Sequence, residues 1–186
     1  GSINWINFKK NIDLYIPRIF WQYDEYIKIL TIDRPQKIMN FLIYNIKNGK
    51  IQKGIYDEDK NGWIDIHDNY KFLKNKSMIW ISEESGYQHI HHSSLDGKLI
   101  NKVTTGNWEV TKIIDINEEN NSIFFMGNNS SVKESHLYSI NIDGTNFNQI
   151  TKEEGVHRII ISPSKKYFID SFSSSKNPLK IILKNM

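Results

Sequence analysis

The sequence repeats a pattern of short apolar segments about every 45 to 50 residues. Three of the repeats contain the same kind of two-residue turn, a glycine preceded by Asn or Asp. These turns are Asn48-Gly49, Asp96-Gly97 and Asp143-Gly144. Such dipeptides tolerate positive φ angles and are typical of tight hairpins between antiparallel strands. A chain that repeats a hairpin at this period is expected to fold as a series of similar β units.

Each repeat contains up to four segments with strand character. The first segments lie at 15–21, 63–66, 109–116 and 157–162, the second at 28–32, 78–82, 123–127 and 167–171, the third at 41–46, 89–92, 136–140 and 179–183, and the fourth at 51–55, 99–103 and 147–151. Four short antiparallel strands per unit are typical of β-propeller blades, whereas stacked helical repeats would need a period of 3.6 residues, which these windows lack. The composition agrees, because alanine is absent and isoleucine is the commonest apolar residue.

We therefore predict an all-β fold, a β-propeller fragment of about four blades of four antiparallel strands with the last blade incomplete. The predicted blades span 13–57, 58–106, 107–152 and, incompletely, 153–186, with 1–12 as the tail of a preceding blade. The Gly1-Ser2 start resembles a cloning scar, so we expect the chain to come from a longer protein. An arc of blades leaves sheet faces and an edge uncovered, which predicts a homodimer through these surfaces.

Charge and composition exclude several classes of protein. The apolar runs are a few residues long, far below the roughly 18 to 20 residues of a membrane-spanning helix, so we expect no membrane span. The net charge of +3 is small and evenly spread, which gives no basis for nucleic-acid binding. The absence of cysteine excludes disulfides, thiolate metal clusters and a cysteine nucleophile.

Local sequences then identify a family. The run Asp13 to Ile19, with Trp21 and Asp24, resembles the "YIPR…W…NRxQ" passage in the propeller of bacterial dipeptidyl peptidase IV-like enzymes, which belong to the prolyl oligopeptidase family. Further matches follow in the family's order at 33–36, 63–65, 72–73, 80–89, 104–110, 134–138, 143–145, 155–157, 162–163 and 167–170. The chain departs from the family pattern at 88–92, where the family has "GYRHLY", and at Ser164-Lys165, where it has Asp-Gly.

The resemblance implies a parent protein with an eight-bladed N-terminal propeller and a C-terminal α/β-hydrolase domain. That domain would carry a Ser-Asp-His triad and remove N-terminal dipeptides after proline or a small residue. This chain matches the C-terminal half of the propeller. It contains no Gly-x-Ser-x-Gly elbow for a nucleophilic serine, so we expect it to be inactive by itself.

The resemblance also implies partners and a location for the parent protein. The expected partners are a peptide substrate and the missing hydrolase domain, with no nucleic acid. The parent is expected in the periplasm or at the outer membrane of a bacterium, while the compartment of this chain is unknown. The dipeptide specificity stays open.

One loop is the candidate substrate contact. The segment 63–70 lies where family members place a strand and a loop near the substrate cavity, so the resemblance predicts substrate-binding roles for Asp65, His67 and Asp68. Glu83-Glu84 is a tempting alternative, because these exopeptidases hold the substrate's ammonium group with adjacent glutamates. In the family that pair lies in an earlier blade. We therefore interpret Glu83-Glu84 as a solvated turn between two strands.

Histidines and tryptophans are assigned structural roles. On a strand, His89 and His91 share a face while His92 points away, so at most two of them converge and no metal site is predicted. His136 and His157 are expected to form buried hydrogen bonds between strands. Trp63, Trp80 and Trp108 are expected to pack between blades, with a sugar- or peptide-stacking surface as the alternative. No cofactor is predicted.

The predicted function is that of a propeller segment which gates substrate access and walls the substrate cavity in a dipeptidyl peptidase IV-like serine exopeptidase. The alternative is a stand-alone propeller that binds proteins or peptides and has no hydrolase activity. The sequence that follows this segment in the full gene would distinguish the two. No motif supports a third possibility, an independent enzyme acting on small molecules.

Overall fold

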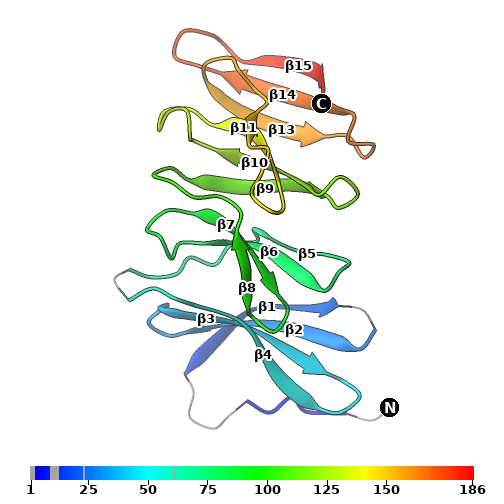
Figure 1. The fold of residues 1–186 in the computed structure, drawn as a ribbon. Helices are drawn as coiled ribbons and strands as arrows, with labels where there is room; N and C mark the ends of the chain where they lie inside the picture. Colours follow the sequence, from blue (N-terminus) through cyan, green and yellow to red (C-terminus); the bar gives the residue numbers. More distant parts are fainter. Residues whose placement is uncertain (1–2, 9–12, 23, 61) are drawn as a thin grey trace. The chain divides into compact units, whose positions relative to one another are not determined.

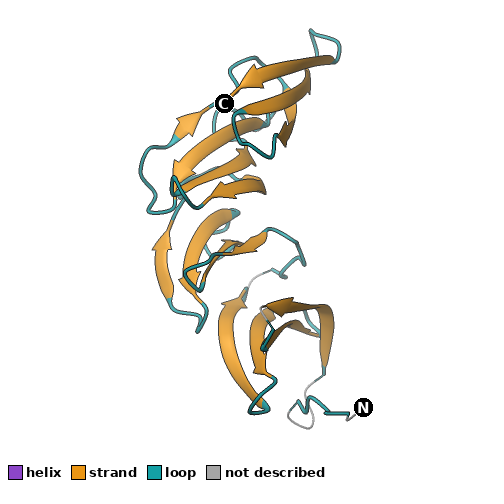
Figure 2. Cartoon of the chain, turned by 90° about the vertical axis from the view of Figure 1, so that its right-hand side faces the viewer, coloured by secondary structure: helices purple, strands orange, loops and turns teal. Residues whose placement is uncertain are grey.

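The computed structural model describes residues 3–8, 13–22, 24–60 and 62–186 (Figure 1). All the regular structure in these residues is β-strand, as the orange ribbons of Figure 2 show. No helix of the described residues is long and apolar enough to cross a membrane. The chain divides into two compact units. Unit 1 comprises Gly1–Asp68 and Ser93–Lys98, and unit 2 comprises Asn69–His92 and Leu99–Met186.

Sheet 1 contains the first four strands in sequential order, all antiparallel. They are β1 (Leu14–Gln22), β2 (Tyr26–Asp33), β3 (Ile38–Asn45) and β4 (Lys50–Glu58). Residues paired across antiparallel strands share a face, so Lys28 and Leu30 of β2 lie on the same face as Ile43 and Phe41 of β3. These four side chains are buried. Sheet 1 therefore buries a lysine beside three apolar side chains.

Sheets 2 and 3 repeat the four-stranded arrangement. Sheet 2 consists of β5 (Tyr70–Phe72), β6 (Ser77–Ser82), β7 (His89–Ser94) and β8 (Leu99–Lys102), and sheet 3 of β9 (Val110–Asn117), β10 (Ser122–Gly127), β11 (His136–Asn141) and β12 (Asn148–Gln149). Alternation along β10 distributes its side chains between two cores. Ile123 and Phe125 join a cluster with residues of sheet 2, while Phe124 and Met126 join one with sheet 4.

Sheet 4 has three strands among the described residues, β13 (Val156–Ile161), β14 (Tyr167–Ser173) and β15 (Lys180–Asn185), in the order β13-β14-β15. Phe168 of β14 is fully buried against sheet 3. Successive sheets of unit 2 thus pack through apolar side chains, each of which contributes roughly 1.5 to 3 kcal/mol when fully buried. The prediction of an all-β propeller fragment with an incomplete last blade is confirmed.

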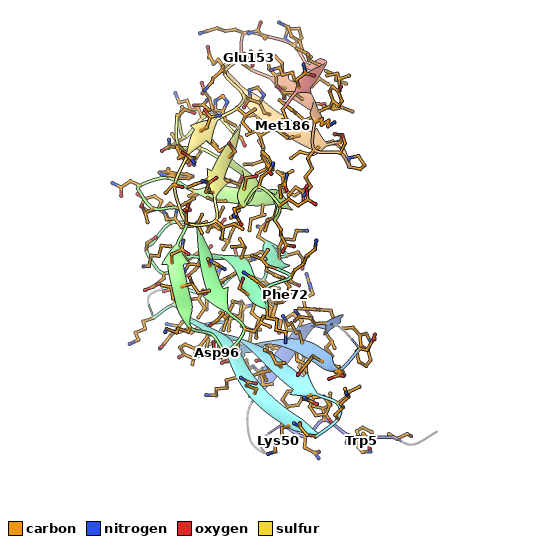
Figure 3. The ribbon with its side chains drawn as sticks, turned by 45° about the vertical axis from the view of Figure 1, so that its right-hand side comes forward. Trp5, Lys50, Phe72, Asp96, Glu153 and Met186 are labelled. Atoms are coloured by element: carbon orange, nitrogen blue, oxygen red, sulfur yellow. The ribbon has the colours of Figure 1, made fainter. Side chains whose placement is uncertain are left out.

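The three glycine turns occupy equivalent places. Asn48-Gly49 joins β3 to β4, Asp96-Gly97 joins β7 to β8, and Asp143-Gly144 joins β11 to β12, so each links the third and fourth strands of its sheet (Figure 3 labels Asp96). Gly49, Gly97 and Gly144 all have positive φ. The turn chemistry of the sequence therefore identified the hairpins correctly.

One predicted strand is wrong. Residues 63–66 form no strand, and the first strand of sheet 2 is β5, which pairs with β6 at Tyr70 and Trp80. The amide of Ile64 instead donates a hydrogen bond of 2.6 Å to the carbonyl of Gln36, in the β2–β3 turn of unit 1. Ile64 is buried there. This contact explains why the apolar dipeptide Trp63-Ile64 does not belong to a strand.

The blade boundaries at 57/58, 106/107 and 152/153 stay predictions. The predicted tail at 1–12 falls partly outside the described residues, and its described part, 3–8, contains no strand.

Candidate functional site

The predicted substrate residues lie in the connection between β4 and β5. Asp65 and Asp68 are exposed and His67 is half-buried. The buried side chain of Ile64 and its bond to Gln36 anchor the start of this connection to sheet 1. The loop thus carries two carboxylates and an imidazole, and its first residues are anchored to sheet 1.

Asp68 is engaged by an arginine from β1. Nε of Arg18 lies 2.8 Å from Oδ1 of Asp68, and Nη2 lies 3.3 Å from Oδ2, which makes a bidentate ion pair. Arg18 also donates from Nη1 to the carbonyl of Pro17. The hydrogen bond from Arg18 holds the pKa of Asp68 below its usual value, and the charge of His67 acts in the same direction. Asp68 is therefore an anion that fixes the loop to sheet 1.

The structure brings Asp68 and His67 into electrostatic contact, whereas Asp65 makes no hydrogen bond within the described ranges. What the three can do chemically is to hold a cation at an exposed surface, because both carboxylates are solvent-accessible acceptors. The roles of Asp65, His67 and Asp68 stay predictions.

Glu83 and Glu84 lie in the turn between β6 and β7, as predicted. The amide of Gly86 donates to the carbonyl of Glu83 at 2.8 Å and closes the turn. Glu83 accepts a hydrogen bond from Gln88, and Glu84 lies 3.4 Å from Nζ of Lys102. Both carboxylates therefore have local partners.

The histidines of β7 are buried and separately partnered. The rings of His91 and Trp80 meet edge to face with centroids 5.6 Å apart. Burial lowers the pKa of His91 to about 4, so the ring is neutral at neutral pH. His92 lies 2.8 Å from Oγ of Ser77 and 3.2 Å from Oδ1 of Asn101, and burial lowers its pKa too. Within the described ranges, no group of three or more His, Cys, Asp or Glu side chains could hold a metal ion.

A second set of histidines forms a repeated link between strands. Nδ1 of His89 lies 3.1 Å from the hydroxyl of Thr104, which accepts a hydrogen bond from the amide of Ile90. His136 and Thr151 repeat this arrangement at the same 3.1 Å. In both sheets the histidine opens the third strand and the threonine follows the fourth. The predicted buried hydrogen bond of His136 is present.

Two of the three tryptophans pack as predicted and one does not. Trp80 is buried, and Trp108 packs against the core of sheets 2 and 3, stacked on Phe125. Trp63 is 66% exposed, so its predicted packing between blades is wrong. The reason is the missing strand at 63–66, because without pairing the indole does not enter a sheet face.

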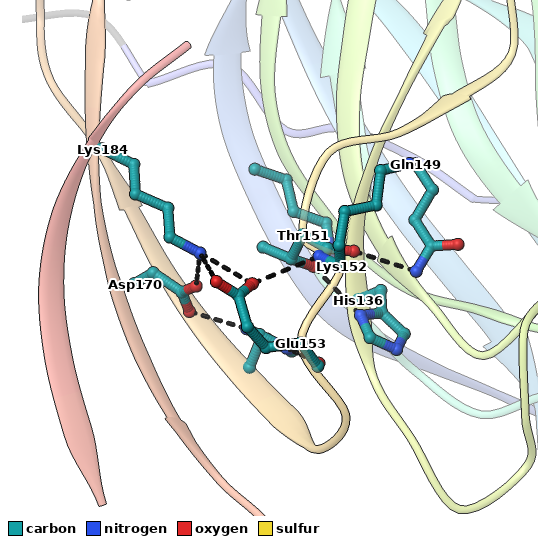
Figure 4. A network of polar contacts seen from close by, with 9 residues as sticks. His136, Gln149, Thr151, Lys152, Glu153, Asp170 and Lys184 are labelled. Atoms are coloured by element: carbon teal, nitrogen blue, oxygen red, sulfur yellow. Dashed lines mark hydrogen bonds and ion pairs between the residues drawn. The ribbon is translucent and has the colours of Figure 1, made fainter.

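Unit 2 contains a polar cluster, of which the sequence analysis predicted only the hydrogen bond of His157. His157 of β13 and Asp170 of β14 are fully buried and hydrogen-bonded at 2.8 Å, which is the interstrand bond predicted for His157. Lys184 of β15 lies between the carboxylates of Asp170 and Glu153 (Figure 4). No sequence pattern indicated Glu153 or Lys184, because the contact of Lys184 with Asp170 depends on the register of β14 with β15. The cluster thus joins a histidine, two carboxylates and a lysine.

An apolar hollow of about 610 Å³ lies on the other face of sheet 1. Its wall includes Leu42, Tyr44 and Ile51 of sheet 1, and Trp5 and Phe8 from the segment 3–8. Sequence reasoning did not identify this hollow, because it depends on where the segment 3–8 crosses the sheet.

Comparison with known proteins gives a consistent result. The family described as "Dipeptidyl peptidase IV (DPP IV) N-terminal region" matches residues 2–179. The chain is 23% identical over 168 residues to "Probable dipeptidyl-aminopeptidase B" of Tuber melanosporum, covering 82% of this chain and 18% of that protein. It is 28% identical over 144 residues to "Dipeptidyl peptidase 4" of Arthroderma otae, covering 73% and 19%.

A solved structure shares the fold. The crystal structure of Porphyromonas gingivalis dipeptidyl peptidase 4 matches with a TM-score of 0.85 and 23% identity, over 97% of this chain and 26% of that one. The chain therefore spans about a fifth of the length of the curated relatives.

Proposed function

Because this chain belongs to the family of dipeptidyl peptidase IV N-terminal regions, we propose that it is a propeller segment of a serine-type exopeptidase which releases N-terminal dipeptides. The observation that carries the proposal is the family match over residues 2–179. The names of the relatives support it, since the matched proteins are dipeptidyl peptidases or aminopeptidases. In this proposal the chain binds and guides substrate, and a hydrolase domain cleaves it.

The catalytic step is assigned to residues outside this sequence. An α/β-hydrolase serine needs a strand-to-helix elbow, Gly-x-Ser-x-Gly, with an oxyanion hole beside it. No such pentapeptide occurs in the 186 residues. Sequencing the full reading frame tests the proposal. A downstream Gly-x-Ser-x-Gly elbow followed by Asp and then His would support it, and a frame without them would favour a binding platform instead.

We further propose that this segment restricts access of substrates and walls the cavity through the loop that carries Asp65, His67 and Asp68. Support comes from the chemistry of the loop, because an exposed carboxylate attracts the ammonium group of a peptide N-terminus. Asp68 is paired with Arg18, which leaves Asp65 as the more available anion.

The substitution Asp65→Asn in the full-length protein tests this role. We expect KM for a dipeptide-releasing substrate to rise about 3- to 10-fold with kcat little changed, because one charge-assisted contact to bound substrate is lost. Asp59→Asn, in the same connection, is the matched control and should leave KM unchanged. Equal KM values for Asp65→Asn and the unsubstituted protein would exclude Asp65 from the substrate contact.

A homodimer is the last part of the proposal. Ile160, Ile169 and Leu183 lie side by side across β13, β14 and β15, as their register shows. They are 67%, 39% and 70% exposed and form an apolar patch on one face of sheet 4. Such a face is typical of surfaces that bind another protein. We propose that two copies of this chain bury it against each other.

A further inference from the structure

The charged cluster of sheet 4 has an unusual arrangement of hydrogen-bond partners. Nδ1 of His157 lies 2.8 Å from Oδ1 of Asp170, and Nε2 lies 2.8 Å from the carbonyl oxygen of Glu153. Both side chains of the His157–Asp170 pair are completely buried. A carbonyl oxygen can only accept, and an ionised carboxylate can only accept. The ring therefore faces an acceptor at each nitrogen.

A neutral imidazole has a single N–H and cannot donate in both directions. His89 and His136 do not meet this difficulty. In each of them Nδ1 faces a threonine hydroxyl, which can donate, while Nε2 faces the carbonyl of Gly106 or the carboxylate of Glu134. A neutral ring satisfies both of those sites. His157 is thus the exception among the three.

The position of Lys184 indicates which group holds the proton. Its Nζ lies 3.1 Å from Oδ2 of Asp170 and 2.9 Å from Oε2 of Glu153, so a cation contacts both carboxylates (Figure 4). The hydrogen bond from Lys184 lowers the pKa of Glu153 to about 2. Burial acts to lower the pKa of Lys184, but its bonds to Glu153 and Asp170 outweigh burial and raise it. Lys184 and Glu153 are therefore charged over the ordinary pH range.

The other neighbours of His157 are compatible with a cation. The ring of Phe172 stacks on it with centroids 4.8 Å apart, and the ring of His136 lies 4.9 Å away. His136 is paired with Glu134, whose carboxylate accepts from Nε2 at 2.8 Å. A ring with one proton satisfies both partners of His136, so the hydrogen bonds of His136 require no like charge beside His157.

We propose that His157 is a buried, doubly protonated imidazolium, and that Glu153, Lys184, Asp170 and His157 form a row of alternating charges that latches sheet 4 together. The row links the loop after β12 to all three strands of the sheet. A buried charge is costly unless it is paired and hydrogen-bonded, and each member of this row lies between partners of opposite charge or acceptor oxygens.

The latch depends on one proton. When His157 loses it, one of the two acceptors no longer has a donor, and Asp170 keeps only Lys184 as a cationic partner. Because the two acceptors that stabilise the proposed imidazolium are present only in the folded chain, the folded chain loses stability when the ring is deprotonated at higher pH. The cluster therefore stabilises sheet 4 most at pH values at which His157 keeps both ring protons.

Nitrogen NMR of the 186-residue chain tests the proposal directly. A long-range ¹H–¹⁵N correlation at pH 7.5 should show both ring nitrogens of His157 protonated, whereas His136 should show one protonated and one bare nitrogen. The spectrum of His157→Gln assigns the signals. A bare nitrogen on His157 at this pH would overturn the proposal.

Two variants extend the test. In Asp170→Asn the amide can donate to Nδ1, so His157 should become a neutral ring with one bare nitrogen, while Thr105→Val, a change outside the cluster, should leave its spectrum as it was. An unchanged His157 signal in Asp170→Asn would contradict the assigned partner.

Thermal unfolding of the unsubstituted chain and of His157→Gln from pH 6 to 10 tests the latch. The melting temperature of the unsubstituted chain should fall relative to the variant by roughly 4 °C or more as the pH rises. Parallel curves would show that the proton does not hold the sheet. If His157→Gln does not fold, the signals that change in Asp170→Asn but not in Thr105→Val identify His157 in the spectrum of the unsubstituted chain, and that spectrum decides.

Discussion

Lys28 of β2 is a buried lysine on the same face as Leu30, Phe41 and Ile43. It is 1% exposed, and burial lowers its pKa from 10.5 to about 7. The unfolded chain keeps this proton up to about pH 10.5, so between about pH 7 and 10.5 it binds more protons than the folded chain. By linkage, the contribution of Lys28 to stability increases with pH over this range.

We therefore predict that Lys28→Met stabilises the chain at pH 6 by roughly 2 to 4 kcal/mol, because the substitution removes a buried charge and keeps the volume. The advantage should shrink towards pH 10. Lys53→Met, at an exposed position of β4 in the same sheet, is the control and should change stability little. Urea unfolding at the two pH values measures the effect, and a gain that does not vary with pH would contradict the burial argument.

Single residues show what the sequence could and could not reveal. Burial of His136 and His157 was predictable, because both lie in strand segments that match the family pattern. The residues that contact these histidines were harder to predict. Lys184 reaches Asp170 only because β15 pairs with β14 in a register that places Ile182 opposite Asp170 and Lys184 opposite Phe168, on the same face. A pairing register is a property of two strands, and neither sequence states it alone.

At the scale of the element, a glycine turn recurs between the third and fourth strands of successive sheets. Gly97 and Gly49 occupy the same place in their sheets and both have positive φ, at 90° and 67°. Their surroundings differ. A Cβ on Gly97 would lie 2.1 Å from the carbonyl oxygen of Gly54, whereas the nearest atom to a Cβ on Gly49 is the Tyr44 hydroxyl at 3.8 Å.

We predict that Gly49→Ala costs about 1 to 2 kcal/mol of stability, from backbone strain alone. Gly97→Ala should cost at least about 2 kcal/mol more, because a backbone oxygen must also move. Urea midpoints of the two variants measure this difference. Equal losses would show that Gly54 and Gly97 separate easily.

The elements also mark the limit of sequence patterns. The glycine turns located three hairpins because positive φ is a local requirement that a dipeptide can report. The prediction of a strand at 63–66 was wrong because the conformation at Ile64 depends on a non-local hydrogen bond to Gln36. Tyr70–Phe72, the true first strand of sheet 2, is short and gave no alternating pattern of its own.

At the scale of the whole molecule, the apolar face of sheet 4 predicts self-association. Light scattering over a tenfold concentration range should show a mass rising above the 21.9 kDa of one chain, towards twice that value. Leu183→Lys should return the chain to a monomer, because a charge within the face must be desolvated on pairing. Val132→Lys, at an exposed loop position, is the control. A constant mass of one chain at high concentration would exclude the dimer.

The proposed place of this chain in a dipeptidyl peptidase is tested most directly by measuring the release of a chromogenic group from Gly-Pro and Ala-Pro substrates. We predict that the full-length gene product cleaves them and is blocked by a serine-directed inhibitor. The 186-residue chain, which has no serine elbow, should release nothing above buffer. A full-length protein without this activity, or turnover that follows the isolated chain through purification, would contradict the account.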